Sequence, residues 1–475
     1  MESAKGLRIH VSMKAAASIV VAAALIVTGL VSPEIAGLTH EGKMVLFILL
    51  AGVVLWVTEA VPLVATSFIM LVMMPLTGVC SFNDAYANTA GSIVFFLMAT
   101  FTFTVVLDAT TVPTRIAGAV LRWSGTNSRK MMLGLMVAIA IVSMVMSDVA
   151  ACGTFISVAK RLLELNGAEK GKSGLGKALM IGIPWASYAG GCMVMTGNGC
   201  NVITVGLFSE LFGVNVTFVE WMMMGVPFGV ILLLLAWEVL CRVYKPEAIK
   251  QEAIDETIAE VEKLDPLSLP EKKTVAIILL AITCWVLSSW ISVLNTAMVG
   301  LLAIVLLSIP GSSTISFKTI ISRMNWDVIL MIMCILSLAH FIVATGAGDW
   351  IVSVVIGAVP MALQMPTVII LVLATIGCVL HNIMPVGTAV AGVLAYPFGM
   401  IAMQFDISMA AMVIIVAVQA SISYILPIDL VPVQTYTTGY YKMSDTAKVG
   451  WAMSLVLIIL MATMLPALCG AFGLA

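Results

Sequence analysis

The chain is a succession of long apolar runs separated by short polar segments. Its uninterrupted apolar runs cover residues 14–31, 44–61, 62–79, 91–111, 218–241, 274–291, 294–309, 326–345 and 446–470. A helix needs about 20 mainly apolar residues to cross the hydrocarbon core of a bilayer, and these runs approach or reach that length. The pattern therefore predicts an all-α polytopic membrane protein.

Two further apolar segments, 131–163 and 366–401, are each divided near the middle by polar residues. The dividing residues are Ser147-Asp148 in the first segment and His381-Asn382 in the second. Each segment is too short for two full crossings, which would need about 40 residues. We therefore expect two re-entrant hairpins, each entering and leaving the membrane on the same side.

Segments 177–208 and 408–441 are too long for one plain helix, and each is interrupted near its centre. The interruptions are Gly197-Asn198-Gly199 and Pro427-Ile428-Asp429. Non-helical backbone at membrane depth is tolerated only where it is buried in protein or lines a water-filled cavity. Paired interruptions in two halves of a chain are typical of the binding site of a transporter. The two segments are thus predicted to be broken helices that help to form a solute site.

Composition supports a membrane location and excludes several other classes. Of the 475 residues, 61% are hydrophobic and only 10% are charged, whereas a soluble domain carries about 25% charged residues. The net charge of −2 indicates no nucleic-acid partner. The sequence contains no G-x-x-x-x-G-K-[ST] loop for ATP and no H-E-x-x-H zinc motif. The sequence therefore predicts neither an enzyme nor a cofactor.

The basic residues predict the orientation. Threading eleven spans with the N-terminus in the cytoplasm places every Lys and Arg on the cytoplasmic side except Lys43, as the positive-inside rule requires. We expect about eleven transmembrane helices plus the two hairpins in the plasma (inner) membrane. The N-terminus is then cytoplasmic and the C-terminus lies outside.

The two halves of the chain share an order of elements. A segment opened by Phe82 corresponds to one opened by Phe317, 235 residues later, and the same offset takes Ser147 to Asn382. An odd number of crossings separates the two segments, which favours two inverted repeats. The predicted organisation is an N-terminal segment with the first helix (1–40), a first repeat (41–244), a polar cytoplasmic connector (245–273) and a second repeat (274–475).

Asp148 lies at the interruption of the first hairpin, and Asp429 lies at the interruption of the second broken helix. A carboxylate near the middle of a membrane costs about 2.5–3.5 kcal/mol on insertion scales, so it needs a cation, a proton or a polar partner. Both aspartates are candidate ligands of a coupling sodium ion, with a proton as the other candidate. The structural alternative for Asp148 is that it caps the second arm of the hairpin.

The remaining candidates are polar side chains and flexible backbone at the same interruptions. The predicted cation-binding residues are Ser147, Asp148, Gly197, Gly199, Asn382 and Asp429. The predicted substrate-binding residues are Ser147, Val149, Asn198, His381, Asn382 and Thr388. No Lys or Arg lies at any interruption, so an anion would be held by amide dipoles, hydroxyl groups and bound cations.

Several of these residues resemble motifs of a known family. The run Trp56-Val-Thr-Glu-Ala-Val-Pro62 resembles a signature of the divalent anion–sodium symporters, and Ser147-Asp148-Val149 stands where that family has a Ser-Asn-Thr hairpin motif. The glycine-rich stretch 190–201 resembles the first helix break of the family, and Leu426-Pro427 its last one. The second hairpin motif fits either 381–383 or 387–389.

The resemblance implies a homodimer in which each subunit has a scaffold domain and a mobile transport domain. In the family, hairpin tips and broken helices form one site for an anion and its sodium ions, and transport follows an elevator-like movement. Substrates of the family are di- or tricarboxylates, or sulfate.

The sequence as a whole favours a secondary carrier for a small organic anion, with a di- or tricarboxylate as the leading class, driven by sodium ions through alternating access. A sodium/proton antiporter or an inorganic-anion carrier on the same architecture is the alternative. A membrane scaffold without transport is a third hypothesis, which no feature of the sequence favours.

Overall fold

The computed structural model describes residues 13–291, 293–357 and 365–474. In this part of the chain, all regular secondary structure is helical. The helices of the first half are α1 (Met13–Val31), α2 (His40–Thr58), α3 (Leu63–Leu76), α4 (Phe82–Ala87), α5 (Ser92–Asp108), α6 (Val112–Ser124), α7 (Ser128–Ser143), α8 (Asp148–Leu165), α9 (Gly174–Met193), the 3-10 turn η1 (Met195–Gly197), α10 (Gly199–Phe212) and α11 (Phe218–Tyr244). Those that follow are α12 (Gln251–Glu262), α13 (Leu269–Leu287), α14 (Thr296–Ser308), α15 (Phe317–Arg323), α16 (Trp326–Ala344), α17 (Ala347–Gly357), α18 (Pro366–Ile383), α19 (Gly387–Gln404), α20 (Met409–Ser421), α21 (Leu430–Tyr436) and α22 (Met443–Phe472). The basic residues Lys5 and Arg8, which contribute to the predicted orientation, lie outside the described residues.

The chain packs as two compact units. Among the described residues, the first comprises 13–90 together with 330–354, and the second comprises 91–291, 293–329, 355–357 and 365–474.

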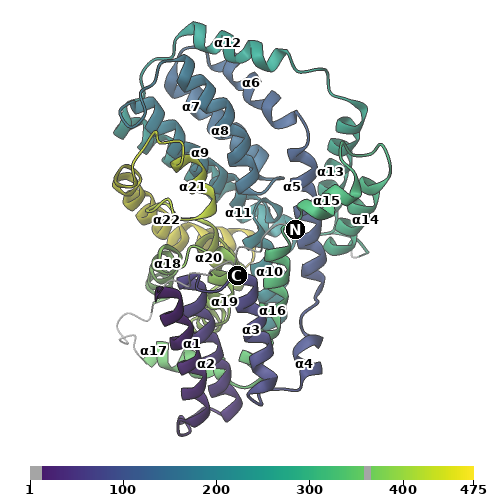
Figure 1. Cartoon of the computed structure of the whole chain (residues 1–475), viewed down its shortest axis with the longest axis vertical. Helices are drawn as coiled ribbons and strands as arrows, with labels where there is room; N and C mark the ends of the chain where they lie inside the picture. Colours follow the sequence, from purple (N-terminus) through teal and green to yellow (C-terminus); the bar gives the residue numbers. More distant parts are fainter. Residues whose placement is uncertain (1–12, 292, 358–364, 475) are drawn as a thin grey trace, which may run out of the picture. The chain divides into compact units, whose positions relative to one another are not determined.

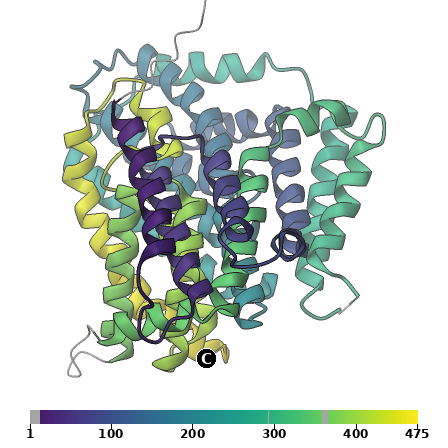
Figure 2. The same cartoon turned by 60° about the horizontal axis from the view of Figure 1, so that its bottom comes forward.

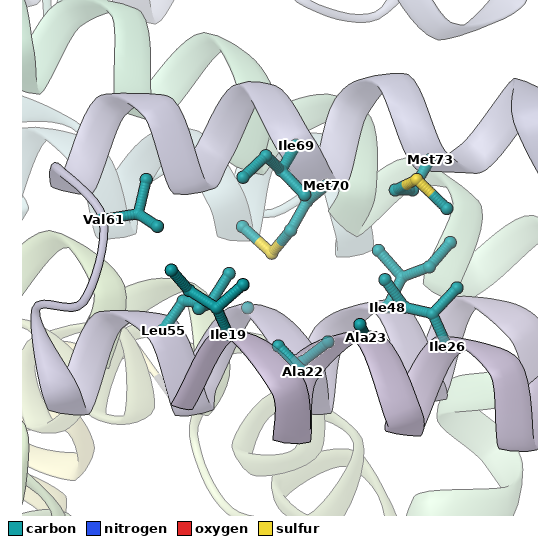
Figure 3. A pocket seen from close by; sticks show the side chains of 12 residues that line it. Ile19, Ala22, Ala23, Ile26, Ile48, Leu55, Val61, Ile69, Met70 and Met73 are labelled. Carbon is teal, nitrogen blue, oxygen red and sulfur yellow. The ribbon is translucent and has the colours of Figure 1, made fainter. Parts of the chain in front are cut away.

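In the first unit, α1 and α2 lie side by side, as Figure 2 shows. Glycine permits this approach, because a Cβ atom at Gly29 would lie 2.9 Å from the Phe47 side chain. Together with α3 the pair lines a cavity of about 150 Å³ that has no polar lining, and Met70 points from α3 toward the other two helices (Figure 3). Apolar cavities of this kind exclude water.

The second unit is built around two helices, α9 and α20, that are buried along almost their whole length. Helix α20 consists of apolar and small residues except for Gln419 and Ser421. A helix that is apolar on every side must be surrounded by protein or lipid. Helices α7, α8 and α11 pack around α9, while α10, α18 and α19 pack around α20.

Helix α5 is followed by a bend of 62° into α6. Glu271, in the first turn of α13, holds this bend, because one carboxylate oxygen accepts hydrogen bonds from the N–H (2.8 Å) and the hydroxyl (2.9 Å) of Thr111. Its other oxygen accepts from the N–H of Ser268 at 2.7 Å. The start of α13 is thereby tied to the start of α6.

The polar segment predicted as a connector contains α12, which lies along α6 and α8 (Figure 1). Its apolar face, including Ile254 and Val261, is buried, and its Glu260 pairs with Arg161 of α8 at 2.7 Å. The helical periodicity of this segment in the sequence is therefore realised as an amphipathic helix packed on the second unit.

All four interrupted segments are divided, three of them at the predicted residues; the second hairpin is divided at 384–386, just after the predicted His381-Asn382, which still belong to α18. A break separates α7 from α8 and another separates α18 from α19, within the two predicted hairpins. The predicted broken helices correspond to α9–α10 and α20–α21. The short helices α4, α6, α15 and α17 were not predicted, because each is too brief or too polar to form an apolar run.

Among the described residues, seven helices are long and apolar enough to cross a membrane, or eight if the bent pair α5–α6 forms one span. The predicted runs 62–79 and 294–309 correspond to the shorter apolar helices α3 and α14. The chain is thus a multi-pass helical protein. Helices α4 to α11 and α15 to α22 follow one another in the same order of short, long and interrupted elements.

Glu271→Gln tests the bond that holds the bend. The N–H of Thr111, the strongest of several donors, lowers the pKa of Glu271 from 4.5 to about 2. The ionised Glu271 carboxylate therefore stabilises the fold fully above about pH 4.5, and this stabilisation is lost as the pH falls toward 2. We expect the substitution to cost about 1–3 kcal/mol at pH 7, measured by thermal unfolding in detergent.

The difference in stability between wild type and Glu271→Gln should shrink as the pH is lowered from 5 to 3. The control is Glu262→Gln, which removes an exposed ion pair with Arg122 and should have little effect. Equal stability of wild type and Glu271→Gln at pH 7 would contradict the assignment.

Candidate functional site

The tip of the first hairpin positions Asp148. Helix α7 ends at Ser143 and α8 begins at Asp148, with Ser147 as its N-cap. The Ser147 hydroxyl accepts a hydrogen bond from the N–H of Ala150 (3.4 Å), and the Ser147 N–H donates to the Thr104 hydroxyl of α5 (2.9 Å). Because Ser147 caps the helix, the Asp148 side chain is free to make other contacts.

The Asp148 side chain lies in a cage of neutral hydrogen-bond donors. It is 2% exposed. The Ser143 hydroxyl donates to Oδ1 and the Asn198 amide donates to Oδ2, both at 2.5 Å. The Ser187 hydroxyl donates to the Asp148 main-chain oxygen at 3.0 Å. Among the described residues no basic side chain forms an ion pair with Asp148, so its charge is balanced only by dipoles.

Two glycines let three chain segments meet around this carboxylate. A Cβ atom at Gly191 would overlap the carboxylate of Asp148. A Cβ atom at Gly197 would lie 2.6 Å from the Gly191 oxygen and 2.9 Å from the Ser143 oxygen. Any larger residue at these positions would push the first hairpin away from α9 and from the first break.

The first break turns the chain so that Asn198 serves two purposes. Its backbone is extended (φ −140°, ψ 140°), and its side-chain oxygen caps α10 by accepting from the N–H of Cys200 at 2.7 Å. Its amide nitrogen remains available for Asp148. Nearby, the Asn201 amide donates to the oxygens of Gly191 (2.7 Å) and Val194 (3.1 Å), which holds the end of α9 in place.

The second break places Asp429 beside the same helix. Asp429 is half-buried and caps α21 by accepting from the N–H of Leu430 at 2.8 Å. The Tyr188 hydroxyl donates to its other carboxylate oxygen at 3.1 Å. Ser187 and Tyr188 are neighbours on α9, so consecutive residues of one helix contact Asp148 and Asp429.

Each hairpin contacts the break of the other half. The Gln434 amide on α21 donates to the oxygen of Val149 in the first hairpin at 3.1 Å. In the second hairpin, a Cβ atom at Gly387 would lie 2.7 Å from Cys200 Sγ, beside Gly199 of the first break. The four interrupted segments predicted from the sequence therefore come together in the second unit.

His381 and Asn382 lie at the end of α18 and do not contact the Asp148 cage. His381 is buried, and its Nδ1 lies 2.8 Å from the Gln419 main-chain oxygen. A carbonyl only accepts, so Nδ1 carries the proton. Asn382 donates back to Cys378 at 2.8 Å within its own helix. Thr388 is buried in the first turn of α19.

Sequence reasoning did not select Ser143, Ser187 or Tyr188. Isolated hydroxyl groups inside apolar runs are common in membrane helices, so their presence alone is a weak signal. Ser143 lies four residues before the predicted motif at Ser147, and Ser187 precedes the Gly190-Gly191 pair. Only the close approach of three segments reveals that both serines face Asp148.

The oxygen atoms around Asp148 form the candidate cation position. Ser143 Oγ lies 2.9 Å from the Ser187 main-chain oxygen and 3.2 Å from Ser187 Oγ, which itself lies 3.4 Å from Asp148 Oδ1. Hard monovalent and divalent cations prefer such oxygen ligands. His, Cys, Asp and Glu side chains form no group of three or more suited to a metal ion anywhere in the described ranges.

An all-helical membrane fold with a buried carboxylate between interrupted helices places this protein in the class of membrane transporters. Residues 13–469 match the family model described as the sodium:sulfate symporter transmembrane region. The chain belongs to this family.

Curated relatives match along most of the chain. A sodium-dependent dicarboxylate transporter, SdcS of Staphylococcus saprophyticus, is 25% identical over 451 residues, which covers 89% of this chain and 85% of that protein. A protein of Cupriavidus necator described as a membrane protein is 26% identical, and the match covers 86% of this chain and 83% of that protein.

A solved structure shares the fold. The YdaH transporter of Alcanivorax borkumensis superposes with a TM-score of 0.53 over 92% of this chain and 99% of that one, at 13% sequence identity.

Gly191→Ala tests the close packing of the cage. The added methyl group would collide with the Asp148 carboxylate, so we expect a loss of about 1–3 kcal/mol in thermal unfolding. The matched control is Gly470→Ala in α22, where nothing lies within 4 Å of an added Cβ atom and stability should be unchanged or slightly higher. A Gly191→Ala protein as stable as wild type would refute this packing.

Proposed function

We propose that this protein is a sodium-coupled secondary carrier of small carboxylates, with dicarboxylates as the leading class, and that it works by alternating access. The relative SdcS, named as a sodium-dependent dicarboxylate transporter, supports the substrate class and the coupling ion. The observation that carries the proposal is the buried Asp148 carboxylate, which has no basic partner among the described residues.

Sodium binds at the Asp148 cage in this proposal. A carboxylate taken out of water without a cation is strongly destabilised. Asp148 Oδ1 and the hydroxyls of Ser143 and Ser187 lie within 3.4 Å of one another, so small movements would direct them at one ion. A proton on Asp148 is the alternative occupant. Of the predicted cation set, Asp148 is the direct ligand, while Gly197 provides the close approach and Ser147 the helix cap.

The anion binds at the start of α19 in this proposal. Four interrupted helices begin near one another, and Ser147, Asn198 and Asp429 cap three of them with side chains. The N-cap residue of α19, Val386, makes no side-chain cap, and in this proposal the positive end of the helix dipole attracts an anionic group. The motif of the second hairpin is accordingly assigned to 387–389, with Thr388 as its hydroxyl.

Other predicted residues have supporting positions in this scheme. Val149 and Asn198 approach the site from the first hairpin and the first break, and Gly199 adjoins the contact between Cys200 and Gly387. Asp429 repels an anion unless a second cation binds beside it, so we assign it to the second cation. His381 and Asn382 support the hairpin from α18.

The finer architecture belongs to the same proposal. We infer two inverted repeats, 41–244 and 274–475, joined by the cytoplasmic connector 245–273 and preceded by the segment 1–40. The shared order of elements in α4–α11 and α15–α22 supports this division. The protein would act as a homodimer in the plasma membrane with a cytoplasmic N-terminus and an external C-terminus, and its transport domain would move like an elevator.

Two other transport functions are alternatives to this proposal. The description of the family names sulfate, an inorganic anion. The two carboxylates, Asp148 and Asp429, would also suit a sodium/proton antiporter.

Uptake into proteoliposomes tests the cation site. Wild type should accumulate succinate under an inward sodium gradient, and Asp148→Asn should reduce sodium-dependent uptake by about tenfold or more, because a charged ligand of the ion is lost. The matched control is Asp255→Asn on the exposed face of α12, which should transport like wild type.

The same assay separates the alternatives. Succinate uptake that ignores sodium would contradict the proposal. Uptake of sulfate in place of succinate would select the inorganic-anion carrier, and sodium-driven proton movement without any anion would select the antiporter.

Thr388→Ala tests the anion site. Loss of one hydrogen bond to a carboxylate should raise KM for the substrate by about tenfold, while the sodium dependence at saturating substrate stays unchanged. Thr388→Ser keeps the hydroxyl and should restore the KM. An unchanged KM in Thr388→Ala would remove Thr388 from the site.

A further inference from the structure

Two tryptophans and two basic residues form a row across three helices. None of the four belongs to the Asp148 cage. The Lys130 ammonium lies 4.3 Å from the centre of the Trp123 ring, and the Arg129 guanidinium lies 5.2 Å from that of Trp237. Arg129 and Lys130 are consecutive in the first turn of α7, whereas Trp123 ends α6 and Trp237 lies in the last turns of α11. We call these four residues the cation–tryptophan row.

Hydrogen bonds and packing hold the row in place. Lys130 Nζ donates to the Trp123 main-chain oxygen at 3.1 Å, and the Trp237 indole N–H donates to the Arg129 main-chain oxygen at 3.0 Å. A Cβ atom at Gly134 would lie 3.2 Å from the Trp123 ring, so the absence of a side chain there lets the ring lie against α7. The row is therefore a built feature of the surface.

The row is exposed and carries positive charge. Trp123 is 60% exposed and the Arg129 side chain 49% exposed. Glu238 is shared between Arg129 (2.6 Å) and Arg242 (2.5 Å), so one carboxylate meets two guanidinium groups. Lys130 forms no ion pair with any residue that the structure describes. Three cations with one carboxylate leave this surface with an excess of positive charge.

The row also lies at the boundary between apolar and polar surface. Helix α11 has 27 residues, and Trp237 is its twentieth, where a helix that starts at the membrane face leaves a hydrocarbon core about 30 Å thick. Exposed Leu234 and Leu235 come just before it. On α7, exposed Val137 and Ile141 continue the face of Lys130 toward the membrane interior. Tryptophan and basic residues at such a boundary are typical of the headgroup level.

We propose that the cation–tryptophan row is a binding site for an anionic phospholipid. The phosphate accepts hydrogen bonds from Lys130 and Arg129, and the acyl chains lie along the apolar faces of α7 and α11. Stacking on the two rings keeps the cations at headgroup depth, since a cation near an aromatic face is attracted to it even when exposed. Helix α7, which ends at Ser143, is the first arm of the first hairpin. The bound lipid ties the start of α7 to the membrane surface.

Lipid retention on the purified full-length protein tests this site. Native mass spectrometry and melting in detergent should both show preference for phosphatidylglycerol over phosphatidylcholine in wild type. Lys130→Gln should weaken phosphatidylglycerol retention about fivefold, because each basic residue near an anionic surface contributes about 1 kcal/mol. Lys130→Arg keeps the charge and should retain the preference. The control Lys172→Gln removes another exposed cation, paired with Glu169, and should bind like wild type.

Three outcomes would overturn the proposal. The first is equal retention of both lipids by wild type, and the second is an unchanged preference in Lys130→Gln. The third is a wild-type melting shift reproduced by inorganic phosphate alone, which would identify a phosphate site without a lipid. If Lys130→Gln fails to fold, Arg129→Gln, whose side chain is 49% exposed, should show the same fivefold loss. None of these measurements depends on the transported substrate.

Discussion

A carboxylate buried among the helices of a membrane protein without a basic partner constrains everything around it. Asp148 is 2% exposed and is held by Ser143, Ser187 and Asn198, all of them neutral. Neutral dipoles offset part of the cost of removing a charge from water, and a cation or a proton offsets the rest. In the proposed function, this requirement for a mobile charge is the physical reason for coupling transport to an ion.

The cage exists because small residues allow backbone segments to meet. Gly191 and Gly197 bring the first hairpin, α9 and the first break within hydrogen-bonding distance of one carboxylate. The contact of Val149 with Gln434 and that of Gly387 with Cys200 then link each hairpin to the break of the other half. A displacement of either hairpin would therefore be felt at both breaks, which suits a site whose ion and anion must bind together.

Surface features connect this interior to its surroundings. Glu271 ties the start of α13 to the bend before α6, and α12 covers α6 and α8 through a buried apolar face. The cation–tryptophan row lies at the start of α7, on the arm that ends at Ser143. The proposed lipid site therefore lies on the same hairpin that carries Asp148.

The sequence by itself determined the helical membrane class and the existence of four interrupted segments, because apolar periodicity and helix-breaking residues are local properties. It placed the second hairpin's break at His381-Asn382, whereas the tertiary structure places it at 384–386. The tertiary structure decided which groups surround the aspartates. Ser143, Ser187 and Tyr188 are unremarkable in the sequence. The turn of the first hairpin brings Ser143 to Asp148, and the packing of α9 against that hairpin and against the second break brings Ser187 to Asp148 and Tyr188 to Asp429. The tertiary structure also separated His381 and Asn382 from the cage, because adjacency along a hairpin does not fix the direction of a side chain, and packing against Gln419 does.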